Sequence, residues 1–429
     1  MMQAQSSRQS KKMTADQQQM KVANQGLILR LIHQEAPLSR ADLTARTRLS
    51  PTTVSALVGG LIDCGLVQEL GIDKSRTSGR KPILLDINPT GAVLAVAELQ
   101  KDSINMAVYD LRGQEIDRLI EPVTDYARVG ECLVQSTGRL LAANNIHERQ
   151  LRGICLGVPG IIDPERGIVT ASTVLPIQPD NPFLATIRNR YSGAHIILEN
   201  QSSLCAYAEL DHQIKAGRRN LIFMDVDVGI GAGIVLDGKL FRGSDGLAGE
   251  IGHMTVDLKG PKCACGNRGC LERIASVPAL IQRVIYGMMS GRRTLINELT
   301  QGDFNQIGIP VLRQAADAGD PLVLEAIDET AQALAAGIIS VFNLLNLQTV
   351  VLGGAMAQLG DCLLDRVNAV VVRSVLAAMA KPADRLVYCS RIKENAATQG
   401  GAQLLLDQLL QNFYFKSSTA AFSTGRPAV

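Results

Sequence analysis

The sequence has no tryptophan, and only 3% of its residues are aromatic. It does not lack apolar residues, because 46% of the chain is hydrophobic and 20% is charged, a balance typical of a soluble globular protein. The first twenty residues contain no apolar core of the kind that a signal peptide needs, and this absence argues against secretion. At 429 residues, the chain is long enough for two or three domains.

Residues 330–360 contain no charged residue, and much of this run is apolar. One interpretation is a membrane-spanning helix. Polar amides such as Asn346 and the pair Gly353-Gly354 argue against it, because they divide the run into a helix, a turn and a strand. We therefore expect a buried helix and a core strand, and no membrane insertion.

The charge is unevenly distributed along the chain. Residues 1–90 hold 12 Lys and Arg against 7 Asp and Glu, whereas the remainder holds 31 against 34. A basic N-terminal part on a slightly acidic body indicates a polyanion as the partner of the N-terminal part alone. The nine cysteines, an odd number that includes a metal-type cluster, favour a reducing cytoplasm over an oxidising compartment.

Three cysteines and a histidine fall within one stretch of eighteen residues. The cysteines follow the pattern Cys-x-Cys-Gly-x-x-Gly-Cys, in which Gly266 and Gly269 allow tight turns of the backbone. Three thiolates and one imidazole form a closed four-ligand set typical of structural Zn²⁺, while a disulfide or three unrelated core cysteines are the alternatives. The predicted zinc ligands are His253, Cys263, Cys265 and Cys270.

Two carboxylates flank these four residues. Glu250 stands three residues before His253, and Glu272 stands two residues after Cys270. A metal ion that fixes His253 and Cys270 also fixes these two acids in space. Carboxylates held in this way are suited to hydrogen bonding with the hydroxyl groups of a polyol.

The pattern Glu-x-Gly-His, followed by Cys-x-Cys-Gly-x-x-Gly-Cys-x-Glu, resembles the signature of the ROK family, which is named for repressors, open reading frames and kinases. The resemblance implies an actin-like, two-lobed α/β sugar-kinase fold, with or without an N-terminal DNA-binding domain. It also implies that the four predicted ligands bind zinc. The sugar contacts that it implies are Asn200, Glu250, His253 and Glu272.

The N-terminal part predicts a winged helix-turn-helix domain over residues 21–88, preceded by a disordered tail over residues 1–20. Ser39 is a suitable N-cap for the second helix, and Ser50 with Pro51 opens the third. The expected elements are helices over residues 21–35, from residue 40 onward and from residue 51 to about 64, then strands over 66–70 and 83–87 on either side of a basic wing.

In a winged helix-turn-helix, the third helix enters the major groove and the wing contacts phosphates or the minor groove. The order of helices, the Gly-Leu-Val after the third helix and the Gly-Arg-Lys-Pro of the wing resemble the N-terminal domains of ROK repressors. The alternative is a three-helix protein-interaction module with a merely solvated basic hairpin. The predicted DNA contacts are Ser39, Arg40, Thr52, Thr53, Ser55, Arg76, Arg80 and Lys81.

Residues 89–414 alternate strands and helices, as expected for two α/β lobes with a cleft between them, and residues 415–429 are expected to form a disordered tail. ROK kinases carry Asp-x-Gly-Gly-Thr at the first hairpin, where this chain has Glu-Leu-Gln-Lys-Asp at residues 98–102. They also carry Glu-Asn-Asp-Ala-Asn, whose Asp accepts the sugar hydroxyl proton, where this chain has Gln201. Because an amide cannot accept that proton at neutral pH, we expect a sugar-binding body without kinase activity.

The sequence therefore predicts a cytoplasmic transcriptional regulator, a repressor of carbohydrate uptake or catabolism. It is expected to bind a palindromic operator in double-stranded DNA as a homo-oligomer, dimer or tetramer, and to sense a sugar or sugar phosphate. Two alternatives stay open. One is an active ATP-dependent sugar kinase with a fused DNA-binding domain, and the other is a repressor controlled by a sugar-transport protein.

Overall fold

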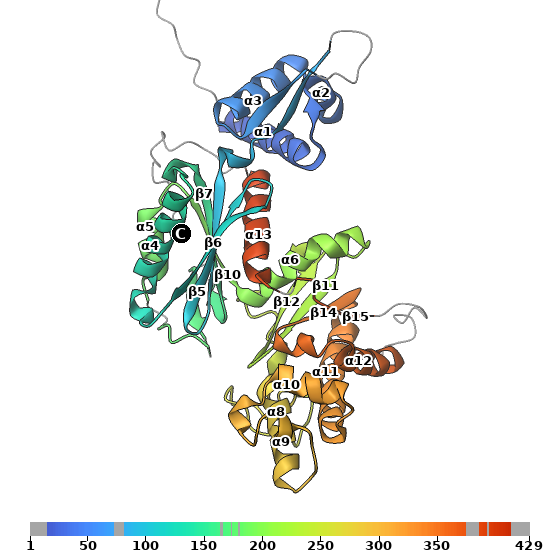
Figure 1. The fold of residues 1–429 in the computed structure, drawn as a ribbon. Helices are drawn as coiled ribbons and strands as arrows, with labels where there is room; N and C mark the ends of the chain where they lie inside the picture. Colours follow the sequence, from blue (N-terminus) through green and yellow to red (C-terminus); the bar gives the residue numbers. More distant parts are fainter. Residues whose placement is uncertain are drawn as a thin grey trace, which may run out of the picture.

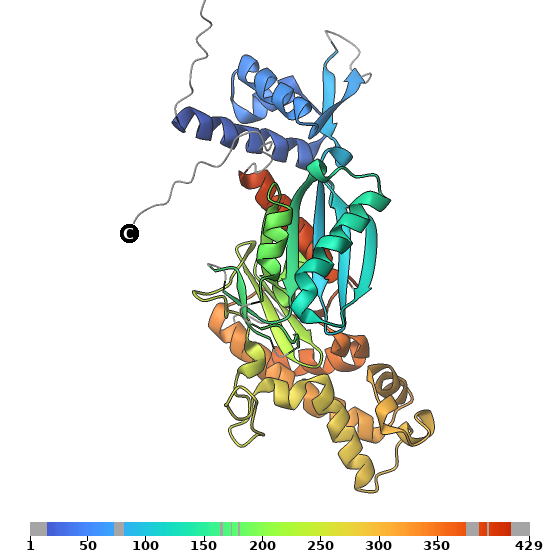
Figure 2. The same cartoon turned by 90° about the vertical axis from the view of Figure 1, so that its left-hand side faces the viewer.

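The computed structural model describes residues 15–72, 81–163, 166–172, 174–178, 181–374, 386–392 and 394–412. These residues form an N-terminal head, a first α/β lobe beneath it and a second α/β lobe beyond the first (Figure 1). The view turned by 90° shows the same order of the three parts (Figure 2). The predicted sequence of a helical head followed by two α/β lobes is therefore confirmed.

The head combines three helices with a small antiparallel sheet of order β1-β3-β2. Both predicted caps are present. Ser39 Oγ accepts a hydrogen bond from the Asp42 backbone N–H at 3.2 Å, and Ser50 Oγ accepts one from the Thr53 N–H at 3.1 Å. The elements of the head are α1 (Ala15–Glu35), β1 (Leu38–Ser39), α2 (Arg40–Thr47), α3 (Pro51–Asp63), β2 (Val67–Ile72) and β3 (Ile83–Ile87).

Two features of the head differ from the prediction. Helix α1 begins at Ala15, so residues 15–20, which we expected in a disordered tail, are helical, because Ala, Gln and Met favour a helix without any apolar periodicity. Strand β1 was not predicted, since two residues are too few to show an alternating pattern. Residues 1–14 and the expected tail over residues 415–429 lie outside the described residues.

The first lobe is built on a five-stranded sheet of order β10-β7-β4-β5-β6. Strands β4 and β10 both run parallel to β7, so the C-terminal ends of these three strands meet at one edge of the sheet. The elements of this lobe are β4 (Val93–Leu99), β5 (Ser103–Asp110), β6 (Glu115–Pro122), α4 (Val129–Ala143), β7 (Leu151–Val158), β8 (Ile161–Asp163), β9 (Ile168–Ala171), α5 (Phe183–Arg190), β10 (His195–Asn200) and the late helix α13 (Ala396–Asn412).

The second lobe contains another five-stranded sheet, of order β13-β12-β11-β14-β15. Its strands are β11 (Leu221–Val226), β12 (Ile230–Leu236), β13 (Lys239–Leu240), β14 (Thr349–Gly353) and β15 (Val387–Cys389). Its helices are α7 (Leu271–Ala275), α8 (Val277–Met289), α9 (Ile296–Leu299), α10 (Ile309–Asp317), α11 (Pro321–Leu345) and α12 (Asp361–Ser374). The 3₁₀ helices of the chain are η1 (Pro89–Gly91), η2 (Tyr126–Arg128), η3 (Glu148–Gln150), η4 (Ile251–His253), η5 (Phe304–Gln306) and η6 (Ala355–Leu359).

The uncharged run over residues 330–360 forms the end of α11, a turn at Asn346 and the buried strand β14. Asn346 adopts a left-handed backbone conformation with φ of 48°, which ends the helix. The predicted division into helix, turn and strand is confirmed. Within the described residues, every helix is too short or too polar to cross a membrane.

Helix α6 (Gln201–Lys215) and helix α13 form the layer between the two sheets. One hydrophobic core joins these helices to both sheets and to the head. A second core lies under α4 and α5 on the outer face of the first lobe, and a third fills the helical side of the second lobe. The head is therefore packed on the body rather than merely tethered to it.

Candidate functional site

The backbone between Thr255 and Cys270 forms a compact turn that brings distant side chains together. Gly266 and Gly269 have φ values of 93° and 67°, a region that L-residues rarely adopt. A Cβ atom at residue 269 would lie 1.6 Å from the carbonyl oxygen of Asp257. Glycine is thus required at residue 269 both by backbone conformation and by the lack of space.

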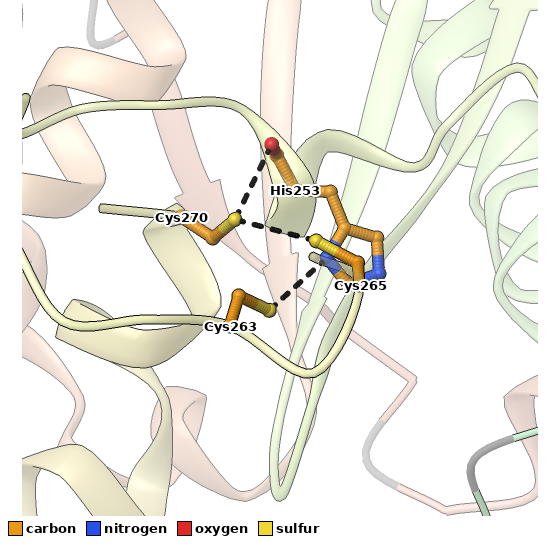
Figure 3. Close-up of side chains that lie close together, drawn as sticks. All are labelled: His253, Cys263, Cys265 and Cys270. Atoms are coloured by element: carbon orange, nitrogen blue, oxygen red, sulfur yellow. Dashed lines mark hydrogen bonds between the residues drawn. The ribbon is translucent and has the colours of Figure 1, made fainter. Parts of the chain in front are cut away.

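The four predicted metal ligands point toward one another (Figure 3). Cys263 Sγ lies 3.7 Å from His253 Nδ1, and Cys265 Sγ lies 3.7 Å from Cys270 Sγ. The candidate ligand atoms all lie within 4.8 Å of one another. A tetrahedral site with metal–sulfur bonds of about 2.3 Å requires sulfur atoms about 3.8 Å apart, so this geometry suits a metal ion.

The sulfur atoms do not form a disulfide. A disulfide bond is about 2.05 Å long, and all nine cysteines of the chain are free. Burial raises the pKa of the Cys270 thiol to about 12, whereas a hydrogen bond from the Asn267 backbone lowers the pKa of Cys265. A metal ion bound here would supply the positive charge that allows all three sulfurs to be thiolates, and the arrangement of the four side chains can hold such an ion.

A cavity of about 370 Å³ lies between the two lobes, at the C-terminal ends of their parallel strands. All four predicted sugar contacts line it, so the structure brings them together with the metal cluster at one wall. The polar residues around the cavity are Gln100, Lys101, Ser172, Asn200, Gln201, Ser202, Asp225, Asp227, Glu250, His253 and Glu272.

The side chains of Asn200 and Glu272 are held in place by the backbone. Asn200 caps helix α6 by accepting a hydrogen bond from the Ser203 N–H at 3.2 Å, and its amide donates to the Gly160 carbonyl at 2.9 Å. Glu272 Oε2 accepts a hydrogen bond from the Ile230 N–H at 3.1 Å. A Cβ atom at residue 229 would lie 2.9 Å from Glu272 Oε2, so this glycine of the turn after β11 leaves room for the carboxylate.

The cavity is acidic. Four carboxylates line it, and Lys101 is the one lysine or arginine among the described lining residues. Burial, with help from Asp227 and Glu98, raises the pKa of Asp225 to about 6. Burial also raises the pKa of Glu250, and the nearby Glu272 adds to this effect. Placing a further negative charge in this cavity is therefore unfavourable.

Gln201 makes a contact that sequence reasoning missed. Its amide donates a hydrogen bond of 2.8 Å to Glu98, a buried carboxylate directly behind the cavity wall. The two residues are 103 positions apart, and only the parallel pairing of β4, β7 and β10 brings them to the same level. Burial raises the pKa of Glu98, so an amide is a better partner here than a second carboxylate.

The predicted DNA contacts fall into three groups. Thr52, Ser55 and Lys81 are exposed, while Thr53 is half-buried with its hydroxyl 2.8 Å from Ser50 Oγ. Thr52, Thr53 and Ser55 lie on α3, the helix that a helix-turn-helix places in the major groove. The predicted contacts of the wing, Arg76 and Arg80, lie outside the described residues.

The other two predicted DNA contacts have structural roles. Ser39 is only 1% exposed, and its hydroxyl donates to the Asp42 carboxylate at 2.7 Å as part of the capping box. Arg40 forms an ion pair of 2.9 Å with Glu69 of β2. Arg48 was not among the predicted contacts; it is an exposed arginine with φ of 57° in the turn between α2 and α3. Its positive charge directly before the predicted recognition helix could have indicated it.

Comparison with known proteins agrees with this architecture. Residues 97–408 match the ROK family, and residues 19–76 match the MarR family. The xylose repressor of Bacillus subtilis (strain 168) is 28% identical over 398 residues, which cover 92% of this chain and 98% of that protein. The DNA-binding transcriptional repressor Mlc of Escherichia coli (strain K12) is 25% identical over 393 residues, which cover 91% and 94% of the two chains.

Solved structures show the same relationship. The crystal structure of a ROK family transcriptional regulator, a homolog of E. coli Mlc, superposes with a TM-score of 0.80 at 26% identity. The superposition covers 92% of this chain and 98% of the chain of that regulator. The ROK hexokinase of Thermus thermophilus gives a TM-score of 0.59 at 25% identity and covers 74% of this chain and 99% of its own. With the family match extending over most of its length, this protein belongs to the ROK family.

Proposed function

We propose that this protein is a cytoplasmic, sequence-specific DNA-binding repressor of carbohydrate-uptake or catabolic genes, which senses a sugar in the interlobe cavity. The observation that carries the proposal is a helix-turn-helix head packed directly on a ROK body. The relatives that match nearly the whole chain are named as repressors, and this supports the same role here.

The two-lobed ROK domain is proposed to bind its ligand without catalysing a reaction. Gln201 stands where kinases of the family use an aspartate as general base, and its amide is already bonded to Glu98. Loss of a general base typically lowers a rate by about 10²–10⁴-fold. We expect no ATP-dependent phosphorylation of D-glucose or D-xylose by the full-length protein. Several turnovers per second would show that it is a kinase instead.

The ligand is proposed to be an uncharged sugar rather than a sugar phosphate. The cavity presents four carboxylates, and a phosphate group carrying nearly two negative charges would be repelled by them. Hydroxyl groups, by contrast, can donate to these carboxylates and accept from the amides of Asn200 and Gln201. Sugar binding is expected to involve Asn200, Glu250, His253 and Glu272.

The metal is proposed to be Zn²⁺ in a structural role. Soft sulfur donors with one imidazole match its preferences. With Nδ1 of His253 beside the sulfurs, its Nε2 faces Glu250 Oε2 at 3.9 Å. Metal-bound histidines usually donate their second N–H to a carboxylate, so the metal would hold Glu250 and this wall of the cavity in place.

The head is proposed to read DNA through α3. Thr52, Thr53 and Ser55 would face base edges, while Lys81 and the turn residue Arg48 would contact phosphates. Arg76 and Arg80 of the wing are proposed to contact phosphates or the minor groove, as expected from the sequence. A homodimer with two-fold symmetry would bind a palindromic operator with two half-sites.

Selection of genomic DNA fragments by the purified full-length protein tests the proposal, at about 150 mM salt to suppress nonspecific binding. Recovery of a few palindromic sites beside transport or catabolic genes is the expected result. Recovery of no preferred fragment would contradict it. Calorimetric titration with sugars then tests the ligand, and no heat from any sugar would favour control by a sugar-transport protein.

A further inference from the structure

Gln201 and Glu98 begin a chain of hydrogen bonds that leads from the cavity wall through the buried side chains of Glu98 and Asn105 to helix α13. Glu98 Oε2 accepts a hydrogen bond from the Asn105 amide at 3.1 Å, and the same amide donates to Asn395 Oδ1 at 3.2 Å. Asn395 directly precedes α13. The position that replaces the catalytic base is therefore connected to the start of α13 by three side-chain contacts.

The first turn of α13 is fixed by a second contact with the same sheet. Thr398 is fully buried, and its hydroxyl accepts hydrogen bonds from Tyr109 Oη at 3.0 Å and from Arg118 at 3.2 Å. Arg118 also donates to Asn105 Oδ1 at 2.5 Å. These bonds join both ties into one hydrogen-bonded network between Glu98 and the start of α13.

The body of α13 fits its surroundings without free space. A Cβ atom at Gly400 would lie 1.8 Å from the Leu204 carbonyl of α6, and one at Gly401 would lie 2.6 Å from Val96 of β4. On the strand side, a Cβ atom at Gly153 would lie 2.8 Å from Leu405. Helix α13 is therefore closely packed against α6, whose first residues line the cavity.

The other end of α13 contacts the head. Tyr207 of α6 donates a hydrogen bond of 2.5 Å to Asp407, and His33 of α1 interacts electrostatically with the same carboxylate. Ile28 and Ile32 of α1 share a buried core with Leu409 of α13. Both ribbon views show α1 lying across the end of α13 (Figure 1, Figure 2).

We propose that α13 is the coupling element through which the interlobe cavity controls the DNA-reading head. It is tied at its first turn to Glu98 and Gln201 behind the cavity, and it supports α1 at its last turns. This proposal rests on the proposed function, because regulation requires a ligand in the cavity. A sugar hydroxyl that draws the Gln201 amide toward the cavity lengthens its hydrogen bond to Glu98, and a buried carboxylate is then left short of a donor. The protein with the Gln201–Glu98 hydrogen bond and the protein without it then differ in their affinity for the sugar, and a ligand shifts a conformational equilibrium only through such a difference.

Hydrogen exchange of the full-length protein, followed by mass spectrometry, tests the coupling without DNA or sugar. Gln201→Glu places a second carboxylate against Glu98 and repels it. We expect the amides of residues 28–35 in α1 to exchange about fivefold faster or more in this variant. The double change Thr398→Val with Asn395→Gly removes both hydrogen-bonded ties between the start of α13 and the sheet, and glycine keeps the left-handed backbone of residue 395 (φ 61°). In that background, Gln201→Glu is expected to change α1 exchange by less than about twofold.

Thr137→Val is the matched control, because Thr137 is another buried threonine whose hydroxyl is bonded, on α4 at the opposite face of the same sheet. It is expected to leave α1 exchange as in the wild type. Unchanged amide exchange of α1 in Gln201→Glu would overturn the coupling. So would an equal acceleration of α1 exchange by Gln201→Glu in both backgrounds. An equal acceleration of exchange in α4 would also overturn it, because the effect would then not be specific to the route through α13. If the wild type selects no genomic fragment, the proposed function fails, yet the exchange result still decides the coupling.

Discussion

Single residues are the basis of the proposal that the interlobe cavity binds a sugar without catalysis. Under this proposal, Gln201 carries an amide in place of a general base, and Glu98 accepts a hydrogen bond from that amide at 2.8 Å. Asn200 and Glu272 are already held by backbone groups, so they are preorganised before any ligand arrives. A preorganised polar cavity favours binding because little ordering remains to be done when the ligand enters.

Glu250→Gln tests the binding role of one carboxylate. We expect this change to weaken the binding of whichever sugar among D-xylose, D-glucose and N-acetyl-D-glucosamine gives heat in calorimetry by about tenfold or more, because a hydrogen bond to a charged group is lost. Glu298→Gln, at an exposed carboxylate of α9 in the same lobe, is the control and should bind like the wild type. Equal affinity in all three proteins would exclude Glu250 from the site.

Asp225 gives the stability of the protein a predictable pH dependence. Its pKa is about 6 in the folded protein, well above its ordinary value, so the folded state holds a proton that the unfolded state has lost. The free energy of unfolding should therefore fall by about 2 kcal/mol between pH 4 and pH 7 through this group. Asp225→Asn is expected to remove that part of the decline in urea unfolding measured at both pH values. An identical decline in the variant would show that Asp225 titrates normally.

At the scale of single residues, the features that depend on local spacing could be predicted from the sequence. The Cys-x-Cys-Gly-x-x-Gly-Cys pattern identified the cysteines that the structure brings together, and the Ser39 cap was correct. Ser39 was also predicted to contact DNA, whereas its hydroxyl is buried in the cap. The contact between Gln201 and Glu98 could not be predicted, because it depends on the register of strands far apart in sequence.

At the scale of elements, the cysteine-rich turn is expected to hold its shape through the metal. Cys265→Ser removes one of four donors and should lower the melting temperature by several degrees, and with it operator affinity, because metal binding contributes to folding. Thermal unfolding and operator titration measure both effects. Cys362→Ser, in α12 and outside the cluster, is the control. Normal stability and affinity in Cys265→Ser would show that the metal has no structural role.

The turn between α2 and α3 is expected to contribute to DNA binding through charge. Arg48→Ala should weaken binding to operator and to unrelated DNA by a similar factor of about three- to tenfold, since a phosphate contact carries no sequence information. The slope of log affinity against log salt should fall by about one. Arg149→Ala, an exposed arginine of the first lobe, should change neither quantity. A selective loss of operator binding would instead place Arg48 at a base.

Elements with strong local signals were predicted well, while those set by packing were not. Ser50 with Pro51 marked the start of α3, and alternation marked β3 over the same residues as in the structure. The start of α1 at Ala15 was missed because its first turns are polar. The short strand β1 exists only because β3 provides it with a partner.

At the scale of the whole molecule, the main finding is continuity between head and body. The two lobes and the head share one core through α6 and α13, so a change at the cavity has a packed route to α1. Both domains were predicted from the sequence, but the contact between them was not. In this contact a helix at residues 396–412 packs against a helix near residue 30, more than 300 positions away. Such a contact has no local pattern in either segment.

The most direct test of a sugar-controlled repressor is the affinity of the full-length protein for its selected operator fragment, with and without the sugar found by calorimetry. Fluorescence anisotropy at about 150 mM salt gives both values of Kd. We predict that saturating sugar weakens operator binding by about tenfold or more, with little effect on unrelated DNA. An operator affinity that is the same with and without a bound sugar would contradict control of the head by the cavity.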